Sequence, residues 1–112
     1  MNVRQKVEKA LKTLTIPSAY QNYLEPPETY ITFFEYDREY EKSDDEIIVK
    51  EYTIQVDLWT KDPKYIPLVQ QIIEAMNQED FILDDEEDLY ERDTKIYHKA
   101  LRFIIENLKE VE

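Results

Sequence analysis

The hydrophobic positions change their period within one segment, residues 51–76. In its first part, up to Trp59, apolar residues alternate with polar ones, a pattern typical of a strand with one buried face. From Ile66 onward, the apolar residues recur at steps of three and four, which is the spacing of a helix stripe. The segment therefore predicts a strand that leads through a short turn into a helix. The residues that carry the two periods are Tyr52, Ile54, Val56 and Leu58, and then Val69, Ile72, Ile73 and Met76.

Two prolines, Pro63 and Pro67, lie near the start of that predicted helix. A start at Asp62 would place Pro67 at the fifth helical position, where the missing N–H forfeits a hydrogen bond. A start near Lys64 keeps Pro67 inside the first turn, where the missing donor costs little. The later start is therefore preferred, with Asp62-Pro63 as a turn.

The same periodicities predict the elements on either side. A helix is expected over residues 2–14 and should end before Pro17, because the residue before a proline disfavours the helical region. A connector follows at 17–27, and strands are expected at 29–36, 47–59, 81–90 and 96–105. Both faces of the last strand are partly apolar, which predicts a central strand covered on two sides. The fold class is α+β: a single domain, 1–112, with a four-stranded, mostly antiparallel sheet and two helices in the order α-β-β-α-β-β, and a polar end at 106–112.

Charge is the extreme property of the composition, with a formal net charge of −12. Residues 35–51 carry eight acids and three bases, and residues 79–93 carry nine acids and one base. We predict an acidic hairpin loop at 37–46 and an acidic loop or bulge at 84–88, because adjacent like charges disfavour a flat ladder. Such a surface repels bare nucleic acid, since phosphate contacts need clustered lysine and arginine. Acidity that serves solubility alone is the competing interpretation.

The chain has no glycine and no cysteine. Glycine-rich phosphate loops are therefore excluded, as are disulfides and thiolate metal sites. Turns that need a positive φ must use asparagine or aspartate instead. The candidates are Asn22, Asp37, Asp45, Asn77 and Asp93. No apolar run is long enough to span a membrane, and the charged N-terminus does not resemble a signal peptide, so a cytoplasmic location is expected.

Candidate chemistry is sparse, and we expect no enzyme, no catalytic residue, no cofactor and no metal. His98 is the only histidine, which excludes histidine-paired triads and multi-histidine metal sites and favours a packed or surface histidine. The acids at 84–88 lack the alternation and the central glycine of a calcium-binding loop. Ser18 and Ser43 lie in no nucleophile pattern.

Trp59 is the most informative aromatic residue, because it belongs to the polar face of its predicted strand. Two interpretations stay open: burial beneath the connector 17–27, or contact with another subunit, where tryptophan is enriched. Tyr97 and Arg102, on the last strand, are the other candidate interface residues.

Three strings carry a resemblance to a known family. They are PPETYITF at 26–33, EYTIQVDLWTKDPKYIPLVQQI at 51–72 and DLYERDTKIYHKALRFII at 88–105. With the order of elements, they make residues 3–105 resemble the tail-completion, or tail-terminator, proteins of tailed bacteriophages and prophages. The chain departs from that family at Gln78-Glu79-Asp80, where relatives often have a glycine.

The resemblance implies a non-enzymatic ring, commonly of six subunits, on the head-proximal end of the tail tube. Such a ring stops tube polymerisation and joins the tail to the head, so its partners are other copies of itself, the tail-tube protein and the head-tail connector protein. DNA passes through the ring without specific binding, and an acidic lumen suits that role. The protein is expected in the bacterial host cytoplasm during assembly and then in the virion or a prophage-derived particle. The candidate lumen or inter-subunit residues are Asp37, Glu39, Glu41, Asp44, Asp45, Glu46, Asp84, Asp85, Glu86, Glu87 and Asp88.

A second function class stays open: an acidic inhibitor that mimics DNA and occupies a nucleic-acid-binding protein. That role requires carboxylates spaced along a surface like phosphates, whereas here they are concentrated in two segments.

Overall fold

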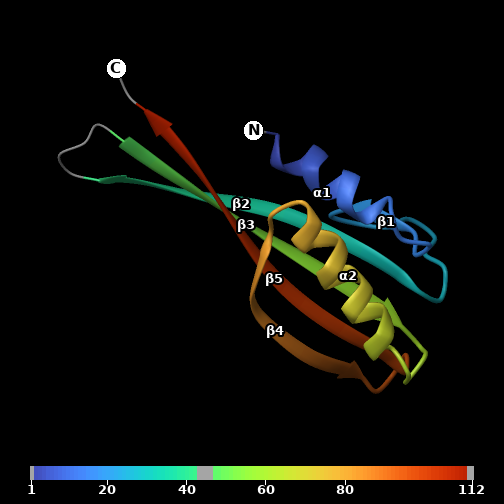
Figure 1. Ribbon diagram of the computed structural model, residues 1–112. Helices are drawn as coiled ribbons and strands as arrows, with labels where there is room; N and C mark the ends of the chain where they lie inside the picture. The colour runs from blue at the N-terminus through green and yellow to red at the C-terminus, as the bar shows by residue number, and fades with distance from the viewer. Residues whose placement is uncertain (1, 43–46, 111–112) are drawn as a thin grey trace.

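The computed structural model describes residues 2–42 and 47–110, with residues 37–42, 47–50 and 107–110 described by their backbone alone. The described chain is α+β, as predicted, with two helices and five strands in the order α-β-β-β-α-β-β (Figure 1). The elements are α1 (Val3–Leu11), β1 (Ser18–Tyr20), β2 (Tyr30–Lys42), β3 (Ile47–Thr60), α2 (Ile66–Gln78), β4 (Ile82–Glu91) and β5 (Ile96–Glu110).

The sheet has five strands in the order β1-β2-β3-β5-β4, so the prediction of four strands is wrong by one. The additional strand is β1, which lies in the predicted connector and pairs with β2 in parallel. Two backbone hydrogen bonds flank it, from Ile31 N to Pro17 O at 2.9 Å and from Gln21 N to Phe33 O at 2.7 Å. Three residues are too few to produce a readable alternation, so the strand depends on β2 as a template. The other three pairings are antiparallel.

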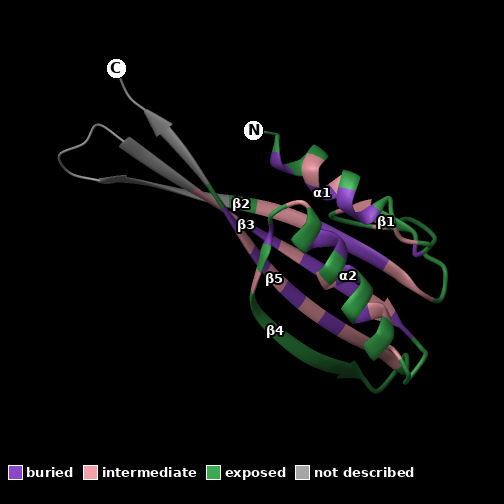
Figure 2. Ribbon diagram, in the orientation of Figure 1, coloured by how far each residue is buried: buried purple, intermediate pink, exposed green. Residues whose placement is uncertain are grey.

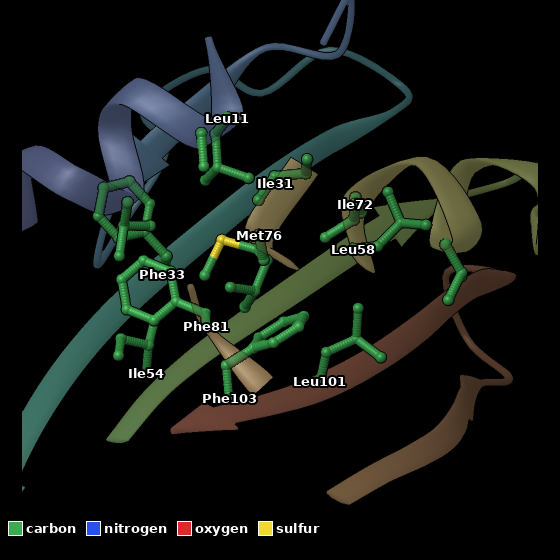
Figure 3. Close-up of a cluster of buried hydrophobic side chains, with 14 of the residues drawn as sticks. Leu11, Ile31, Phe33, Ile54, Leu58, Ile72, Met76, Phe81, Leu101 and Phe103 are labelled. Carbon is green, nitrogen blue, oxygen red and sulfur yellow. The ribbon is translucent and has the colours of Figure 1, made fainter. Parts of the chain in front are cut away.

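Both helices pack on one face of the sheet, and the hydrophobic core lies between the two layers (Figures 1 and 3). Val7 and Leu11 of α1 and Ile72 and Met76 of α2 are fully buried there. Alternate residues of β2, β3 and β5 face this core, as the alternation predicted. Its largest buried members are Ile31, Phe33, Ile54, Leu58, Leu101 and Phe103, and Phe81 joins them from the turn before β4 (Figure 3).

The helix ends follow the local chemistry. The later start of the second helix is confirmed: α2 begins at Ile66, with Tyr65 at the N-cap and Pro67 within the first turn. The first helix ends at Leu11, three residues earlier than expected. The Thr13 hydroxyl donates a 2.7 Å hydrogen bond to the Ala10 carbonyl, which also accepts the Thr13 backbone N–H at 3.3 Å in the turn that ends the helix.

Three strands continue beyond the helices and form an arm, made of the last part of β2, the first part of β3 and the last part of β5 (Figure 1). The register runs without interruption to the pairs Lys42↔Ile47 and Ile47↔Glu110. Residues 37–42 are therefore strand rather than loop, and residues 106–110 of the predicted polar end continue β5. The arm makes the molecule elongated, with extents of 53 × 25 × 25 Å.

The acidic segment 84–88 is also strand rather than loop. It lies within β4, and the ladder to β5 continues past it with a register shift between Leu83 and Asp85. The alternative expectation of a bulge is therefore confirmed at Asp84. The bulge relieves the crowding of adjacent carboxylates without ending the strand.

Among the described residues, four that are not glycine have a positive φ: Gln21, Glu25, Asp80 and Lys95. None of the asparagines and aspartates that the sequence suggested is among them, and Asp45 lies outside the described residues. Asp80 is informative because it lies in the segment where the resembling family often has a glycine. Its φ of 72° is a conformation that glycine adopts without steric cost.

Candidate functional site: the helix-free face of the sheet

The face of the sheet opposite the two helices carries no second layer from the described residues (Figures 1 and 2). The expectation that β5 is covered on two sides is therefore wrong for this part of the chain, although β5 is an inner strand. The pairing register places four cross-strand rows on this helix-free face. They are Tyr30–Trp59–His98–Leu89, Thr32–Asp57–Ala100–Glu87, Phe34–Gln55–Arg102–Asp85 and Tyr36–Thr53–Ile104–Ile82.

The first row is a stack of rings. The Trp59 and His98 rings lie 3.7 Å apart between centroids, with an interplanar angle of 13°. On its other side, Trp59 faces Tyr30 at 6.1 Å and 11°. Its indole Nε1 donates a 2.9 Å hydrogen bond to the Thr32 hydroxyl. Both sides of the Trp59 ring and its indole N–H therefore have partners. These contacts fix the orientation of the ring on the helix-free face.

The ring contact that the connector makes to this row is with Tyr30. The connector contributes Tyr23, whose ring lies 5.5 Å from Tyr30, one position further out in the same row. Trp59 itself is half-buried by its neighbours within the sheet. Both interpretations of this residue, burial under the connector and contact with another subunit, stay predictions.

Asp57 is a buried carboxylate at the centre of the helix-free face, only 5% exposed. Gln55 Nε2 donates to its two oxygens at 3.1 and 3.3 Å, and His98 Nε2 lies 2.7 Å from Oδ1. Because an ionised carboxylate only accepts, His98 donates through Nε2. Burying a carboxylate is costly without such partners, so the network holds the His98 ring against Trp59. His98 is packed, as the sequence suggested.

A shallow hollow of about 160 Å³ opens beside His98 on this face. It exists because Ala100 leaves space between His98 and Arg102, the neighbours two positions away on β5. Arg102 bounds it with a guanidinium that contacts Asp84 at 3.2 Å and Asp85 at 3.3 Å. Gln55, Glu87 and Leu89 also line it.

The other half of the acidic segment faces the helices. Lys99 is buried between β4 and α2, and its ammonium lies 2.9 Å from Glu86 and 3.1 Å from Asp88. The Tyr65 hydroxyl also donates to Asp88, at 2.8 Å. Hydrogen bonds from Tyr65 and then from Lys99 hold the pKa of Asp88 below its ordinary value. The pKa of Tyr65 is correspondingly raised, mainly by the same hydrogen bond to Asp88.

Four of the five carboxylates in 84–88 are therefore paired with a cation from β5, and Glu87 makes no ion pair with a described residue. The exposed edge strand β4 carries much less uncompensated charge than its sequence suggests. The remaining candidates of the other acidic segment are divided: Asp37, Glu39 and Glu41 lie on β2 in the arm, and Asp44, Asp45 and Glu46 lie outside the described residues.

The three candidate interface residues do not form one patch. Trp59 and Arg102 both belong to the helix-free face, two rows apart. Tyr97 belongs to the opposite face, where its ring lies 5.4 Å from Tyr65 and 4.9 Å from Tyr90. An interface that contains Trp59 therefore includes Arg102 more readily than Tyr97.

Sequence reasoning missed Asp57 and Lys99. The alternation already placed Asp57 beside Trp59 and Lys99 on the side of Leu101 and Phe103. The missing signal was the cross-strand partner: Asp57 pairs with His98 on β5, and Lys99 pairs with Glu86 and Asp88 on β4.

In residues 2–42 and 47–110, no three or more histidine, aspartate or glutamate side chains gather as a metal site. The expectation of no metal stays a prediction. Within the described part of the chain, no helix has the length and apolar character needed to cross a membrane. A scan against protein-family models and a search of curated proteins each found no match.

Proposed function

We propose that this protein is a structural assembly subunit, not an enzyme, that closes into a ring on the head-proximal end of a bacteriophage or prophage tail tube. The helix-free face is the observation that carries the proposal. A two-layer fold whose sheet presents an ordered row of rings to the outside has a surface suited to another protein. The resemblance of residues 3–105 to tail-terminator proteins supplies the particular assembly, including a ring of about six copies of this chain.

The chemistry of the helix-free face supports protein contact. Trp59, Tyr36 and Arg102 belong to the residue types enriched at interfaces, and Leu89 and Tyr36 are exposed on it. The rings are held by the Asp57 network before any partner arrives. A fixed ring loses little conformational freedom on binding, which favours affinity.

The charge pairing also refines the lumen assignment. Since Lys99 and Arg102 compensate most of segment 84–88, that segment is a weaker candidate for an acidic lumen than segment 37–46. We therefore assign the lumen to segment 37–46, whose described part, residues 37–42, lies on β2 in the arm. DNA that passes such an acidic segment is repelled rather than bound.

The test is an assembly assay with the tail-tube protein from the same genome. Light scattering measures the mass of the purified protein alone and with tubes, and electron microscopy counts tube lengths. The proposal expects a ring at tube ends and tubes that stop growing as the protein is added. A strict monomer that neither binds tube protein nor limits tube length would contradict it.

A matched pair of variants locates the contact. Leu89 and Tyr90 are neighbours on β4 with similar exposure, 41% and 49%, but they belong to opposite faces. Leu89→Gln on the helix-free face should weaken assembly at least tenfold, and Tyr90→Gln should leave it unchanged. Equal effects of the two substitutions would remove the helix-free face from the proposal.

The DNA-mimic alternative has less support. Carboxylates that imitate phosphates must be free to meet a basic surface, whereas Asp84, Asp85, Glu86 and Asp88 already contact Lys99 or Arg102. Salt-sensitive competition with DNA for a DNA-binding protein would favour that alternative.

A further inference from the structure

Ala100 leaves an unfilled position at the centre of the helix-free face. It stands in a cross-strand row between Asp57 on β3 and Glu87 on β4, and its neighbours two positions away on β5 are His98 and Arg102. The hollow of about 160 Å³ opens at this position. Pockets for drug-sized ligands typically measure about 300–1,000 Å³. The hollow therefore suits the end of a single side chain rather than a cofactor.

The two carboxylates that flank Ala100 have no lysine or arginine partner among the described residues. Glu87 is exposed and makes no ion pair there. Asp57 is buried, and the groups that hold it are the Gln55 amide and the His98 ring. The row therefore carries negative charge on both sides of the hollow, which favours a cationic occupant.

The polar groups around the hollow are left to accept hydrogen bonds. The Gln55 amide nitrogen donates to both oxygens of Asp57, so the Gln55 carbonyl oxygen remains an acceptor. His98 donates to Asp57 through Nε2, so Nδ1 of the neutral ring is also an acceptor. Arg102 borders the hollow, but its guanidinium already forms ion pairs with two carboxylates of β4. The group that complements the hollow is therefore a cation with several N–H donors, as in arginine.

This chain presents such a group in the turn between β4 and β5. Of the arginines whose side chains the structure describes, Arg4 and Arg102 form ion pairs within the chain, whereas Arg92 is exposed and forms none. The turn lies at the end of the sheet away from the arm (Figure 1). Arg92 and the hollow are different patches of one molecule, so a contact between them in two copies is heterologous. Contacts of this kind close into rings when the rotation allows it.

We propose that the hollow at Ala100 receives the Arg92 side chain of a neighbouring copy of this chain. The guanidinium would form an ion pair with Glu87 and donate to the Gln55 carbonyl oxygen, while the buried charge of Asp57 attracts it through space. The planar guanidinium, with five N–H donors, matches these acceptors better than an ammonium group. The inference rests on the proposed ring and names the contact that joins its subunits.

A titration with an arginine compound tests the hollow without any assembly. The probe is acetyl-arginine methylamide, added to the ¹⁵N-labelled full chain at 150 mM salt, and acetyl-citrulline methylamide is its uncharged isostere. We expect saturable shifts at the amides of Glu87, Leu89 and Ala100 and at least fivefold weaker binding of the citrulline compound. Equal binding of the two compounds, or no shifts at these amides, would overturn the proposal.

Two carboxylate variants locate the bound guanidinium. Glu87→Gln should weaken binding of the arginine probe at least fivefold. Glu74→Gln removes an exposed carboxylate of α2 that makes no ion pair with the described residues, and it should leave binding unchanged. Equal weakening in both variants would mean that the probe responds to the net charge of the protein, which contradicts a site at Ala100.

Charge reversal tests whether the arginine comes from a second copy. Arg92→Glu and Glu87→Arg should each weaken ring assembly at least tenfold, measured by light scattering with tail tubes. An equimolar mixture of the two variants should recover assembly, because each variant then meets a copy of opposite charge. Lys95→Glu reverses another exposed charge of the same turn and should leave assembly unchanged. Thermal unfolding checks that all variants fold.

The inference and the proposed function can fail separately. If the ring forms equally well with Arg92→Glu, the proposed function stands and the inference is overturned. If the wild-type chain forms no ring although acetyl-arginine methylamide binds at Ala100, the proposed function is wrong, and the hollow receives an arginine of another protein instead of a second copy.

Discussion

Trp59 and His98, the only tryptophan and the only histidine of the chain, stack face to face at 3.7 Å from adjacent strands. Their strands are β3 and β5, the innermost antiparallel pair of the sheet. The Asp57 carboxylate accepts a hydrogen bond from the His98 imidazole, and the Thr32 hydroxyl accepts one from the Trp59 indole. The stack and the hydrogen bond to Thr32 therefore together join three strands on the face that we propose for assembly.

The stacked pair should be energetically coupled. In a double-mutant cycle with Trp59→Leu and His98→Leu, we expect a coupling free energy of about 0.5–1.5 kcal/mol, the range of aromatic pairs beyond area burial. Urea unfolding measures it. A control cycle between His98 and Tyr23, which contacts Tyr30 instead, should give no coupling above about 0.3 kcal/mol. Equal coupling in both cycles would mean that the stack contributes nothing specific.

Replacing the buried Lys99 should affect stability to different extents, depending on the shape of the substitute. Lys99→Met keeps the stem that packs between β4 and α2, and it frees Glu86 and Asp88, which are exposed enough to be solvated. We expect a change within about 1 kcal/mol, because an apolar isostere often replaces a buried charge without loss. Lys99→Ala should cost about 2 kcal/mol through the cavity that it leaves. Equal losses in urea unfolding would assign the stability to charge instead.

Stability should depend on pH through Asp88. Its pKa lies below the ordinary 3.8 in the folded chain, so the stabilisation is present above about pH 4 and is lost as pH falls through the folded-state pKa. Asp88→Asn should therefore reduce stability at pH 7 and have little effect near pH 2. The loss should stay below about 1 kcal/mol, since the carboxylate is more than half exposed.

Urea unfolding at a series of pH values checks this expectation. Glu87→Gln, one position away, is the control for the loss of one charge. An acid limb of the stability profile that does not change in Asp88→Asn would contradict the assignment.

The turn between β4 and β5 should be improved by glycine at one position. Lys95 has a φ of 59°, in the left-handed region that costs a side-chain-bearing residue about 1–2 kcal/mol. Lys95→Gly removes that cost but adds entropy to the unfolded chain, so a net gain of about 0.5–1 kcal/mol is expected. Asp93→Gly, in the same turn without a positive φ, should destabilise. Thermal unfolding of both variants distinguishes relief of the backbone conformation at residue 95 from a general effect of glycine in this turn.

The local sequence predicted what local physics determines. The change of period in residues 51–76 located β3 and α2, and the position of Pro67 located the start of α2 correctly. The alternation of Ile54, Val56 and Leu58 also identified the buried face. These features depend on neighbours within a few positions, so the sequence shows them directly.

The features of the fold and the site that the sequence did not predict depend on residues far away in the chain. Segment 84–88 looked like a loop because five adjacent acids repel each other, and Lys99 and Arg102 on β5 remove that repulsion. β1 is a strand only because β2 lies beside it. The ring stack on the helix-free face likewise needed the pairing of Trp59 with His98, which no local pattern contains.

The pairing of β3 with β5 also affects how fast the chain reaches its native state. Its partners are separated by 37 positions between Thr60 and Tyr97 and by 63 between Ile47 and Glu110. The chain loses the entropy of closing these loops before the β3–β5 contacts stabilise it. Because the contact order is high, we expect slow folding. During synthesis, the centre of the sheet cannot form until β5 has left the ribosome. Until then, β2 and β3 can form only a hairpin in which the edge of β3 has no partner strand.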